Sequence, residues 1–248
     1  MGGAVLPGRL TWQPGTVVEL VPETPRATSI VLELPGWPGH RAGQHVDVRL
    51  TAADGYQAQR SYSIASAPED GYLVLTVGSV PDGEVSPYLA GELRPGDELE
   101  LRGPVGGYFV WDDSIREPVL LVAGGLGIVP FRSMLRHRQA ARGDVAVRLL
   151  YSARSLEDVI YREELMRLAA YDEVDIRFAL TRQWPRTWHG HSGRIDSRLL
   201  SEVSWSAVDR PRVFICGPTP FVETAASTLA AQGQPPDRIK TERFGPAG

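Results

Sequence analysis

Residues 119–130, with the sequence VLLVAGGLGIVP, mark the point at which the pattern of the chain changes. The continuous apolar run Val119–Ala123 is typical of a strand that is buried on both faces of a parallel sheet. The glycines after it permit a tight turn, and Pro130 suits the first turn of a helix. Because strand-like and helix-like segments alternate downstream, we expect a parallel α/β sheet over residues 114–248.

Three further apolar runs in this half are flanked by turn signals, as strands of the same sheet would be. They span residues 145–151, 174–180 and 212–216. Ser155 and Asp158 have the spacing of a capping box, which predicts a helix running from there toward Ala170. Glycines predict the ends of the other two helices: Gly143 after the helix that contains Pro130, and Gly233 after the last one.

The chain before residue 114 has a different pattern. Short runs with β character recur between turns that contain Gly and Pro, which is typical of a barrel or a sandwich. These runs span residues 16–21, 28–34, 45–50, 61–65, 72–77 and 98–101, and a short helix is expected at residues 87–90. We therefore expect two domains, an all-β domain over residues 1–113 and an α/β domain over residues 114–248.

Composition narrows the classes of function. The 248 residues carry a net charge of −4 and no apolar run of the roughly 20 residues that a membrane helix needs, so we expect neither nucleic-acid binding nor membrane insertion. The first residues lack a basic segment followed by an apolar one, which predicts no secretory signal and a cytoplasmic protein.

Metal-dependent chemistry finds little support in the sequence. Cys216 is the one cysteine, so these residues cannot supply the thiolates of a cysteine-ligated iron–sulfur cluster, and redox chemistry would require an organic cofactor. His189 and His191 have no cysteine or carboxylate cluster beside them, which favours a turn over a metal site. We expect no metal.

The glycine turn after the buried strand is a candidate phosphate site. Gly124, Gly125 and Gly127 allow the backbone to approach a ligand, and the helix that follows offers free N–H groups to a diphosphate. The spacing departs from the usual Gly-x-Gly-x-x-Gly pattern, and a strand–helix turn without a ligand is the alternative.

Polar and cationic residues follow the next strands of the predicted sheet. NAD-binding sheets often place an acidic residue after the second strand, whereas here Ser152 and Arg154 stand at that point. Arg182 follows the third strand, and Arg194 lies further downstream. A hydroxyl and three guanidinium groups at one edge of a sheet would suit a 2′-phosphate, which predicts NADP rather than NAD. The alternative for each arginine is a solvated surface charge.

In the first domain, residues 59–66 (QRSYSIAS) combine a cation and an aromatic ring. Side chains alternate along an extended strand, so Arg60, Tyr62 and Ile64 would share one face. The arginine fork matches phosphate oxygens, and the tyrosine presents a flat ring. The alternative is an ordinary solvent-facing pair.

Taken in order, these motifs resemble those of the ferredoxin–NADP reductase family over nearly the whole chain. By that resemblance Arg60 would contact the diphosphate of FAD, Tyr62 would lie against the isoalloxazine ring, and Ser63 would approach its N5 edge. The other motifs that match the family are Gly83-Glu84-Val85-Ser86, residues 103–106, residues 124–130, and Cys216-Gly217-Pro218. Gly83, Val85 and Ser86 would also hold FAD, and Pro130, Gly217 and Pro218 would border NADP.

The resemblance implies an antiparallel β-barrel for the flavin, joined to a nucleotide-binding α/β domain. It also implies an activity: electrons would pass from NADPH through FAD to a separate protein such as a ferredoxin, a flavodoxin, an oxygenase or another metalloenzyme. Ser63, Cys216 and Phe244 would surround the reacting rings, and Phe244 would shield the flavin until nicotinamide enters.

Two departures from the family keep other functions open. Leu126 stands where many members have threonine or serine, and the strand around residues 75–79 is not followed by the arginine that many members use on the adenine side of FAD. A non-catalytic FAD- and nucleotide-binding redox sensor or complex subunit is one alternative, and a reductase of free flavin or of a small molecule is another.

Overall fold

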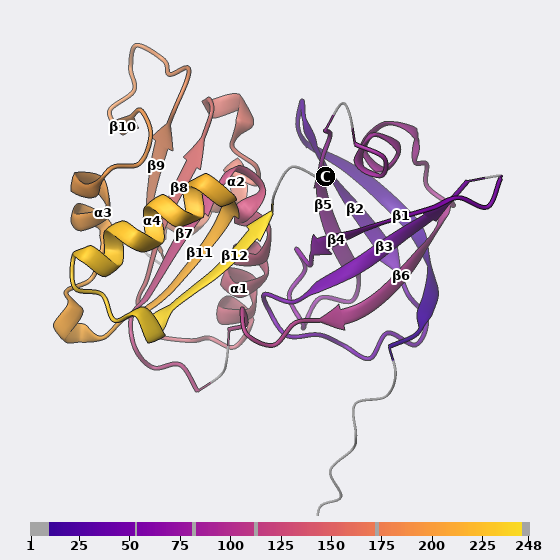
Figure 1. Cartoon of the computed structure of the whole chain (residues 1–248), viewed down its shortest axis with the longest axis horizontal. Coiled ribbons are helices and arrows are strands. Elements are labelled where there is room, and N and C mark those ends of the chain that lie inside the picture. Colours follow the sequence, from indigo (N-terminus) through magenta and orange to yellow (C-terminus); the bar gives the residue numbers. More distant parts are fainter. Residues whose placement is uncertain (1–9, 53, 81–82, 112–113, 172–173, 245–248) are drawn as a thin grey trace, which may run out of the picture.

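The computed structural model describes residues 10–52, 54–80, 83–111, 114–171 and 174–244. Two domains lie side by side, and each contains one six-stranded sheet (Figure 1). The first sheet is antiparallel in the order β4-β3-β6-β1-β2-β5, and the second is parallel in the order β10-β9-β8-β7-β11-β12. The predicted fold class is confirmed. The boundary proposed between residues 113 and 114 adjoins residues outside the described ranges and stays a prediction.

The antiparallel sheet curls into a barrel, because an isolated bridge between Ile64 and Leu75 joins the end of β4 to β5. Inward-facing residues such as Ile30, Leu75 and Leu101 are fully buried and form its core. The strands are β1 (Trp12–Thr24), β2 (Ala27–Glu33), β3 (His45–Thr51), β4 (Gln57–Ser63), β5 (Leu73–Gly78) and β6 (Glu98–Val105), and a short π-helical turn covers Tyr88–Glu92.

In the parallel sheet, the central strand β7 (Val119–Gly124) is buried along its whole length. Leu121 and Ala123 pack with one core on one face, while Leu120 and Val122 pack with a second core on the other. The remaining strands are β8 (Val147–Ala153), β9 (Asp175–Leu180), β10 (His191–Ser192), β11 (Arg212–Pro218) and β12 (Ile239–Phe244).

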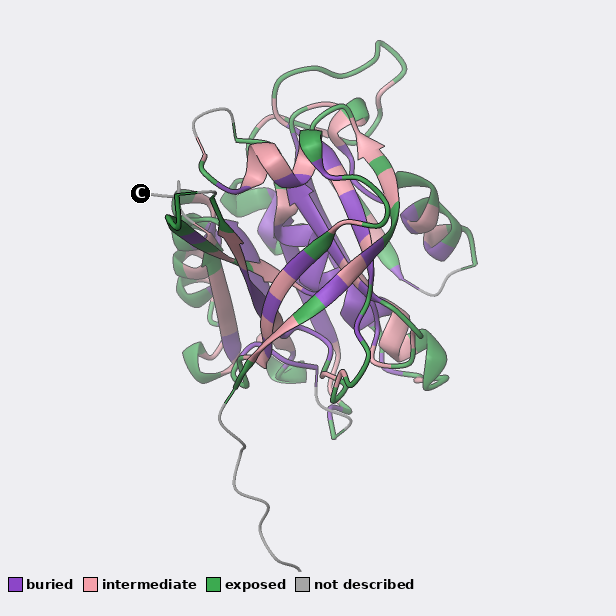
Figure 2. Ribbon diagram, turned by 90° about the vertical axis from the view of Figure 1, so that its right-hand side faces the viewer, coloured by how far each residue is buried: buried purple, intermediate pink, exposed green. Residues whose placement is uncertain are grey.

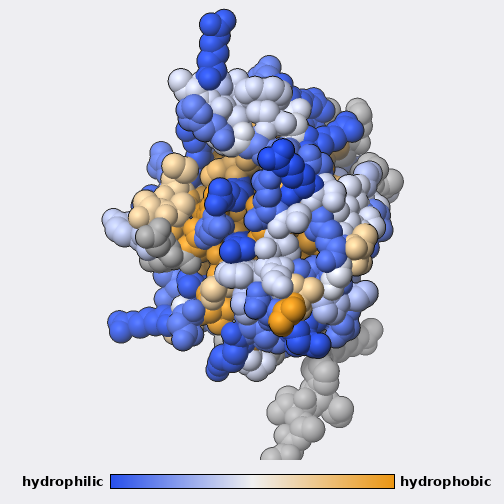
Figure 3. Space-filling model, turned by 90° about the vertical axis from the view of Figure 1, so that its left-hand side faces the viewer, coloured by the Kyte–Doolittle hydropathy of each residue, from blue (hydrophilic) through white to orange (hydrophobic). Residues whose placement is uncertain are grey.

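Helices cover both faces of this sheet (Figure 1). They are α1 (Ile128–Ala140), α2 (Arg162–Ala170), α3 (Ser197–Val203) and α4 (Thr219–Ala231). Figure 2 shows buried residues running along the strands and exposed ones gathered on loops and outer surfaces. On the outer side of the α/β domain, hydrophilic side chains dominate the rim and apolar atoms show between them (Figure 3).

One prediction about local structure was wrong. The helix expected from Ser155 begins only at Arg162, because the Ser155 hydroxyl donates to the Asp158 carboxylate (2.8 Å) instead of capping a helix, and Tyr161 adopts a left-handed conformation (φ 59°). The segment that ends in Phe244 forms strand β12, and β11 supplies a parallel partner for each of its residues.

Two side chains of the α/β domain hydrogen-bond directly to the barrel domain. On α1, the Ser133 hydroxyl donates to the carbonyl of Ser66 (2.6 Å). The buried Tyr161 hydroxyl donates to Thr76 Oγ1 on β5 (2.5 Å). Buried hydrogen bonds fix the direction as well as the distance of their partners, so these contacts hold the two domains in one orientation.

Candidate functional site

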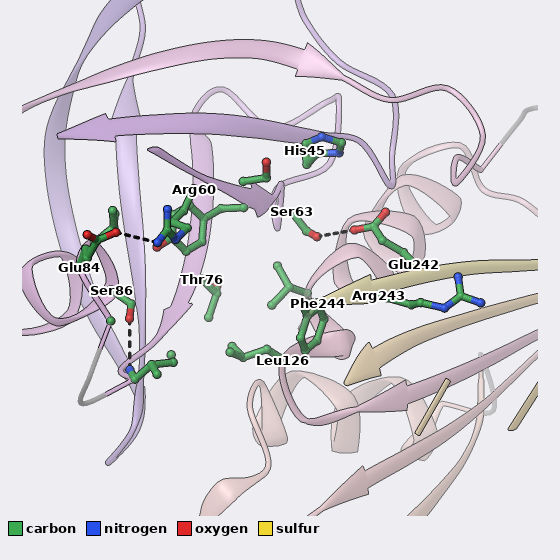
Figure 4. Close-up of a pocket in the computed structure, with 17 residues that line it drawn as sticks. His45, Arg60, Ser63, Thr76, Glu84, Ser86, Leu126, Glu242, Arg243 and Phe244 are labelled. Atoms are coloured by element: carbon green, nitrogen blue, oxygen red, sulfur yellow. Dashed lines mark hydrogen bonds and ion pairs between the residues drawn. The ribbon is translucent and has the colours of Figure 1, made fainter. Parts of the chain in front are cut away.

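A cavity of about 460 Å³ lies between the two domains (Figure 4). The barrel contributes β3, β4, β5 and the loop after β5, and the α/β domain contributes the turn after β7 and the end of β12. The lining residues are His45, Arg60, Ser61, Tyr62, Ser63, Thr76, Gly78, Val80, Gly83, Glu84, Val85, Ser86, Leu126, Val129, Glu242, Arg243 and Phe244. The cavity therefore exists only when both domains are in place.

One end of the cavity carries a guanidinium paired with a carboxylate. Arg60 on β4 donates to Glu84 at 2.8 Å, and the Tyr56 hydroxyl donates to the other oxygen of the same carboxylate at 2.7 Å. These bonds, that from Tyr56 first, lower the pKa of Glu84. Beside them, Gly83 makes a turn so tight that a Cβ atom there would lie 2.9 Å from Ser86 Oγ.

At the opposite end a hydrogen bond crosses between the domains. The Ser63 hydroxyl donates to Glu242 Oε1 at 3.0 Å (Figure 4). Burial raises the pKa of the Glu242 carboxyl, although the bond from Ser63 acts in the other direction. Strand β12 places Glu242 directly beside Cys216 on β11. Cys216 itself is fully buried, and burial together with the Glu242 charge raises its thiol pKa.

The walls between these ends are mostly apolar. Tyr62 packs against the barrel core, and burial raises its pKa to about 12, so its hydroxyl stays neutral. Leu126 and Phe244 line the cavity from the α/β domain (Figure 4). Apolar walls of this kind suit a flat aromatic ring, with polar groups needed only where the ring has donors or acceptors.

Below the cavity, the two glycine-containing turns of the α/β domain are pressed together. A Cβ atom on Gly127 would lie 2.0 Å from the carbonyl oxygen of Cys216, and one on Gly124 would lie 2.9 Å from the Phe221 ring. Gly217 has φ 157° and would also meet Gly124 and Phe221. These positions require glycine because the backbones of the two turns are in contact. The two predicted nucleotide motifs therefore lie together at the carboxyl ends of β7 and β11.

The predicted arginine edge also forms. Arg154, Arg182 and Arg194 follow β8, β9 and β10, which are neighbours in the sheet, and all three side chains are exposed. The backbone N–H of Arg182 donates to the carbonyl of Arg154 at 2.9 Å. The Asp158 carboxylate near Arg154 pairs with Arg26 from the barrel. Burial would raise the pKa of Asp158, but the hydrogen bonds from Arg26 and Ser155 and the charges of Arg26 and Arg154 lower it overall.

The structure divides the predicted site residues into three groups. Arg60, Tyr62, Ser63, Gly83, Val85, Ser86 and Phe244 line the cavity. Gly124, Gly125, Gly127, Pro130, Cys216, Gly217 and Pro218 lie in or beside the two turns beneath it, and Ser152, Arg154, Arg182 and Arg194 belong to the neighbouring sheet edge. Ile64 belongs to none of them, because it is fully buried in the barrel core. The ligand assigned to each residue stays a prediction.

The sequence did not predict the other ten lining residues: His45, Ser61, Thr76, Gly78, Val80, Glu84, Leu126, Val129, Glu242 and Arg243. Glu242 could have been found, since it precedes Phe244 by two residues and strand periodicity puts such a pair on one face. This argument could be made only if residues 239–244 were already known to form a strand.

Known proteins resemble both halves of the chain. Residues 29–110 match the oxidoreductase FAD-binding domain family, and residues 121–227 match the oxidoreductase NAD-binding domain family. Ferredoxin–NADP reductase B of Sorangium cellulosum is 36% identical over 210 residues, which cover 82% of this chain and 84% of that protein.

The glycine betaine monooxygenase reductase subunit of Pseudomonas aeruginosa is 34% identical over 209 residues, or 83% of this chain. The match covers 56% of that relative, so the chain spans little more than half of its length. The FAD- and NAD-binding domain of nitric oxide dioxygenase from Vibrio cholerae superposes with a TM-score of 0.83 at 25% identity, covering 94% of this chain and 99% of that one.

A barrel and a parallel nucleotide-binding sheet that share one cavity define a two-domain flavoprotein oxidoreductase. The chain belongs to the ferredoxin–NADP reductase family, and it carries that family's FAD-binding and NAD-binding domains.

The cavity fits the flavin of this family. Arg60 and the glycine turn at Gly83 offer a cation and a close backbone approach to phosphate, and the apolar walls offer flat contact to the ring. Elsewhere, the described part of the chain groups no three His, Cys, Asp or Glu side chains that would hold a metal ion. None of its described helices is long and apolar enough to cross a membrane.

Proposed function

We propose that this chain is an NADPH-dependent flavin reductase that passes electrons from FAD to a separate redox protein. The observation that carries the proposal is the cavity itself. Arg60 at one end offers a cation to phosphate, and the hydrogen-bonded pair of Ser63 and Glu242 at the other end can hold a proton. Arg60, Gly83 and Ser86 would hold FAD there, and the bound flavin would supply hydride acceptance from reduced nicotinamide and the release of single electrons.

Arg60, Gly83 and Ser86 hold the phosphates in this proposal. The guanidinium forms charge-assisted hydrogen bonds to phosphate oxygens. Tyr62 and Val85 support the ring from the barrel side. Arg60 and Tyr62 lie on β4, which pairs with β3, so their backbone positions are set before any nucleotide binds.

Ser63 and Glu242 provide a place for a proton next to the ring. A carboxyl whose pKa is raised by burial can hold a proton closer to neutral pH than an exposed one does. The Ser63 hydroxyl, at 3.0 Å from Glu242, can relay that proton between the carboxyl and the cavity. Cys216 lies beneath as an apolar support for Glu242.

Phe244 covers the flavin from the α/β side until nicotinamide enters. It lines the cavity at the last position of β12, and its partner in the sheet is Pro218, the last residue of β11. A side chain at the end of an edge strand can move more easily than one in its middle. Phe244 would then be displaced by the nicotinamide ring during reduction.

The exposed arginines select the phosphorylated nucleotide. Arg154 and Arg182, joined through their backbones, present two cations where the adenosine half of a nucleotide would lie on a sheet of this type. Ser152 and Arg194 complete the set.

A separate protein as electron acceptor is supported by the names of similar proteins. Similar proteins are named as a ferredoxin–NADP reductase and as a monooxygenase reductase subunit. An oxygenase or a ferredoxin-type protein is accordingly the class of acceptor we propose.

An anaerobic stopped-flow experiment tests the proposal. The purified protein is expected to be yellow, and NADPH should bleach it much faster than NADH does at low concentration. Reoxidation should be slow with free flavin and fast with a one-electron protein acceptor. A colourless protein that takes up no flavin would rule out the proposal, and equal rates with the two nucleotides would remove the role of the arginines.

A further inference from the structure

Gly78 at the end of β5 and Leu126 in the turn after β7 line the cavity, yet neither takes part in the proposed ligand contacts. Gly78 pairs with Ala27 on β2 and is not among the glycines with positive φ, so its backbone conformation does not require glycine. A glycine in a strand weakens it and often marks a place where another group comes close. The missing side chain at residue 78 therefore points to a close neighbour.

That neighbour is Leu126. A Cβ atom on Gly78 would lie 2.6 Å from Leu126 Cδ1 and 3.4 Å from Leu126 Cγ. The half-buried leucine also packs against the hydrophobic core that α1 forms with the parallel sheet. Its side chain therefore fills the space that a side chain at residue 78 would occupy, and the two residues are complementary across the domain boundary.

This contact is the last of a row along β5. Side chains alternate along a strand, so Val74, Thr76 and Gly78 face the same way. Val74 packs against the core beside α1, and the Thr76 hydroxyl accepts a bond from Tyr161 at 2.5 Å. Gly78 then meets Leu126. The row is a seam between the domains, and its last two contacts form part of the cavity wall.

These last two contacts differ in polarity. The Thr76 hydroxyl is bonded on two sides, to Tyr161 and, at 2.8 Å, to Ser29. At Gly78 the contact consists of a leucine methyl group against backbone. Apolar groups in close contact leave neither room nor bonding partners for a water molecule. Leu126 thus excludes water at the point where the seam reaches the cavity.

We propose that Leu126 and Gly78 form an apolar seal, which closes the cavity to water and small solutes at the seam between the domains. A flavin in the cavity would be shielded by this seal, and that part of the inference rests on the proposed function. The contact between the two residues stands apart from any ligand. Excluding water also strengthens buried hydrogen bonds in the cavity, such as the one from Ser63 to Glu242.

Quenching of the flavin fluorescence by acrylamide tests the seal without measuring activity. The oxidised holoprotein is titrated with this neutral quencher, so charged side chains in the cavity do not bias its approach. In Leu126→Ala the Stern–Volmer constant should rise about threefold, because the truncated side chain leaves a gap beside the cavity. In Gly78→Val it should rise about twofold, because the added side chain collides with Leu126 and forces the seam open.

The double variant Gly78→Val, Leu126→Ala is the decisive one. Valine suits a strand position, and at residue 78 it would point into the space that the leucine leaves. The quenching constant of the double variant should return to within about 1.5-fold of wild type, since substitutions at contacting residues are not additive.

Urea unfolding of the same proteins after removal of the flavin tests the contact by itself. Gly78→Val should lower the unfolding midpoint. Adding Leu126→Ala should raise the midpoint again, although truncating a packed leucine normally lowers it. A double variant that folds where Gly78→Val does not would support the contact in the same way.

Gly71→Val is the matched control. Gly71 is exposed just before β5, and a Cβ atom there would meet nothing within 4 Å. This substitution should leave the quenching constant and the unfolding midpoint unchanged. Near-ultraviolet circular dichroism checks that each variant is folded.

The possible results separate this inference from the proposed function. Quenching that stays at the wild-type level in Leu126→Ala, or losses that add up in the double variant, would overturn the seal while the flavin site stands. A wild-type protein that retains no flavin would overturn the proposed function and the shielding with it. The urea experiment would then decide whether Leu126 and Gly78 are in contact.

Discussion

The flavin cavity and the arginine edge both offer cations to phosphate, yet they are built differently. In the cavity, Arg60 is held by Glu84, and Ser63 is held by Glu242 from the other domain. At the edge, Arg154 and Arg182 are linked through their backbones while their side chains are exposed. One site is enclosed by two domains, and the other lies open on a single sheet.

This difference suggests how one chain can retain FAD for a long time and yet exchange NADPH quickly. Side chains already held by neighbours lose little conformational entropy when a ligand binds, which favours long residence. Exposed arginines must be ordered by each incoming ligand, and their attraction is screened by salt. We expect FAD to stay bound through many turnovers while NADPH and its product exchange.

The largest effect should come from Arg60→Gln. Removing the guanidinium leaves Glu84 without its cation beside the bound phosphate, so FAD affinity should fall about 100-fold, and the protein should lose its yellow colour on gel filtration. Arg94→Gln, at an exposed position elsewhere in the barrel, is the control and should keep its flavin. Unchanged flavin retention in Arg60→Gln would erase the distinction between the two sites.

The double variant Arg154→Gln, Arg182→Gln tests the open site. The apparent affinity for NADPH should fall about 30-fold while that for NADH changes little, since only NADPH carries the 2′-phosphate. Arg177→Gln removes an exposed arginine from the same sheet and should have no such effect. Rates of flavin reduction over a range of nucleotide concentrations provide the measurement, and equal losses for both nucleotides would argue against selection by this edge.

Glu242→Gln tests whether the carboxyl in the cavity between the domains exchanges a proton. At neutral pH, flavin reduction or reoxidation should slow about tenfold, because the amide cannot exchange a proton as the carboxyl can. The pH profile of the wild-type rate should contain a limb above the usual carboxyl range, and the variant should lack it. A limb that persists in the variant would assign the titration to another group.

The same substitution has a predictable effect on stability. Because burial raises the pKa of Glu242 above 4.5, the folded state binds its proton more tightly than the unfolded state does. Its stabilising contribution is therefore fully present below the unfolded pKa and is lost as the pH rises through the folded value. The free energy of unfolding of Glu242→Gln, measured in urea, should gain relative to wild type as the pH increases.

The smallest effect should come from Phe244→Ala. Removing the ring that covers the cavity should raise nicotinamide affinity and the flavin reduction rate about fivefold, because nicotinamide no longer has to displace the ring. Tyr108→Ala, which removes an exposed ring elsewhere along the domain interface, is the control. If affinity and rate both stay at wild-type values in Phe244→Ala, that residue does not shield the flavin.

Much of the fold could be predicted because its signals are local. The fully apolar run of β7 identifies a buried parallel strand, and the glycines after it identify a turn. The short runs and turns of the first half identify strands of a barrel. The helix expected at Ser155 failed for an equally local reason, since the serine bonded to a side chain and Tyr161 took a conformation that delays the helix to Arg162.

By itself, the sequence determined the two-domain architecture and showed that Arg60 and Tyr62 share one face of a strand. Hydrophobic periodicity and turn chemistry act over a few residues, so they can be read locally. Only the tertiary structure decided that Ser63 meets Glu242, 179 residues away, and that Arg60 and Tyr56 bond to the same carboxylate, that of Glu84. The first contact exists because β12 pairs with β11 at the edge of the parallel sheet, and this edge strand packs against the barrel. Such pairings depend on how whole domains pack, and no local pattern along the chain encodes them.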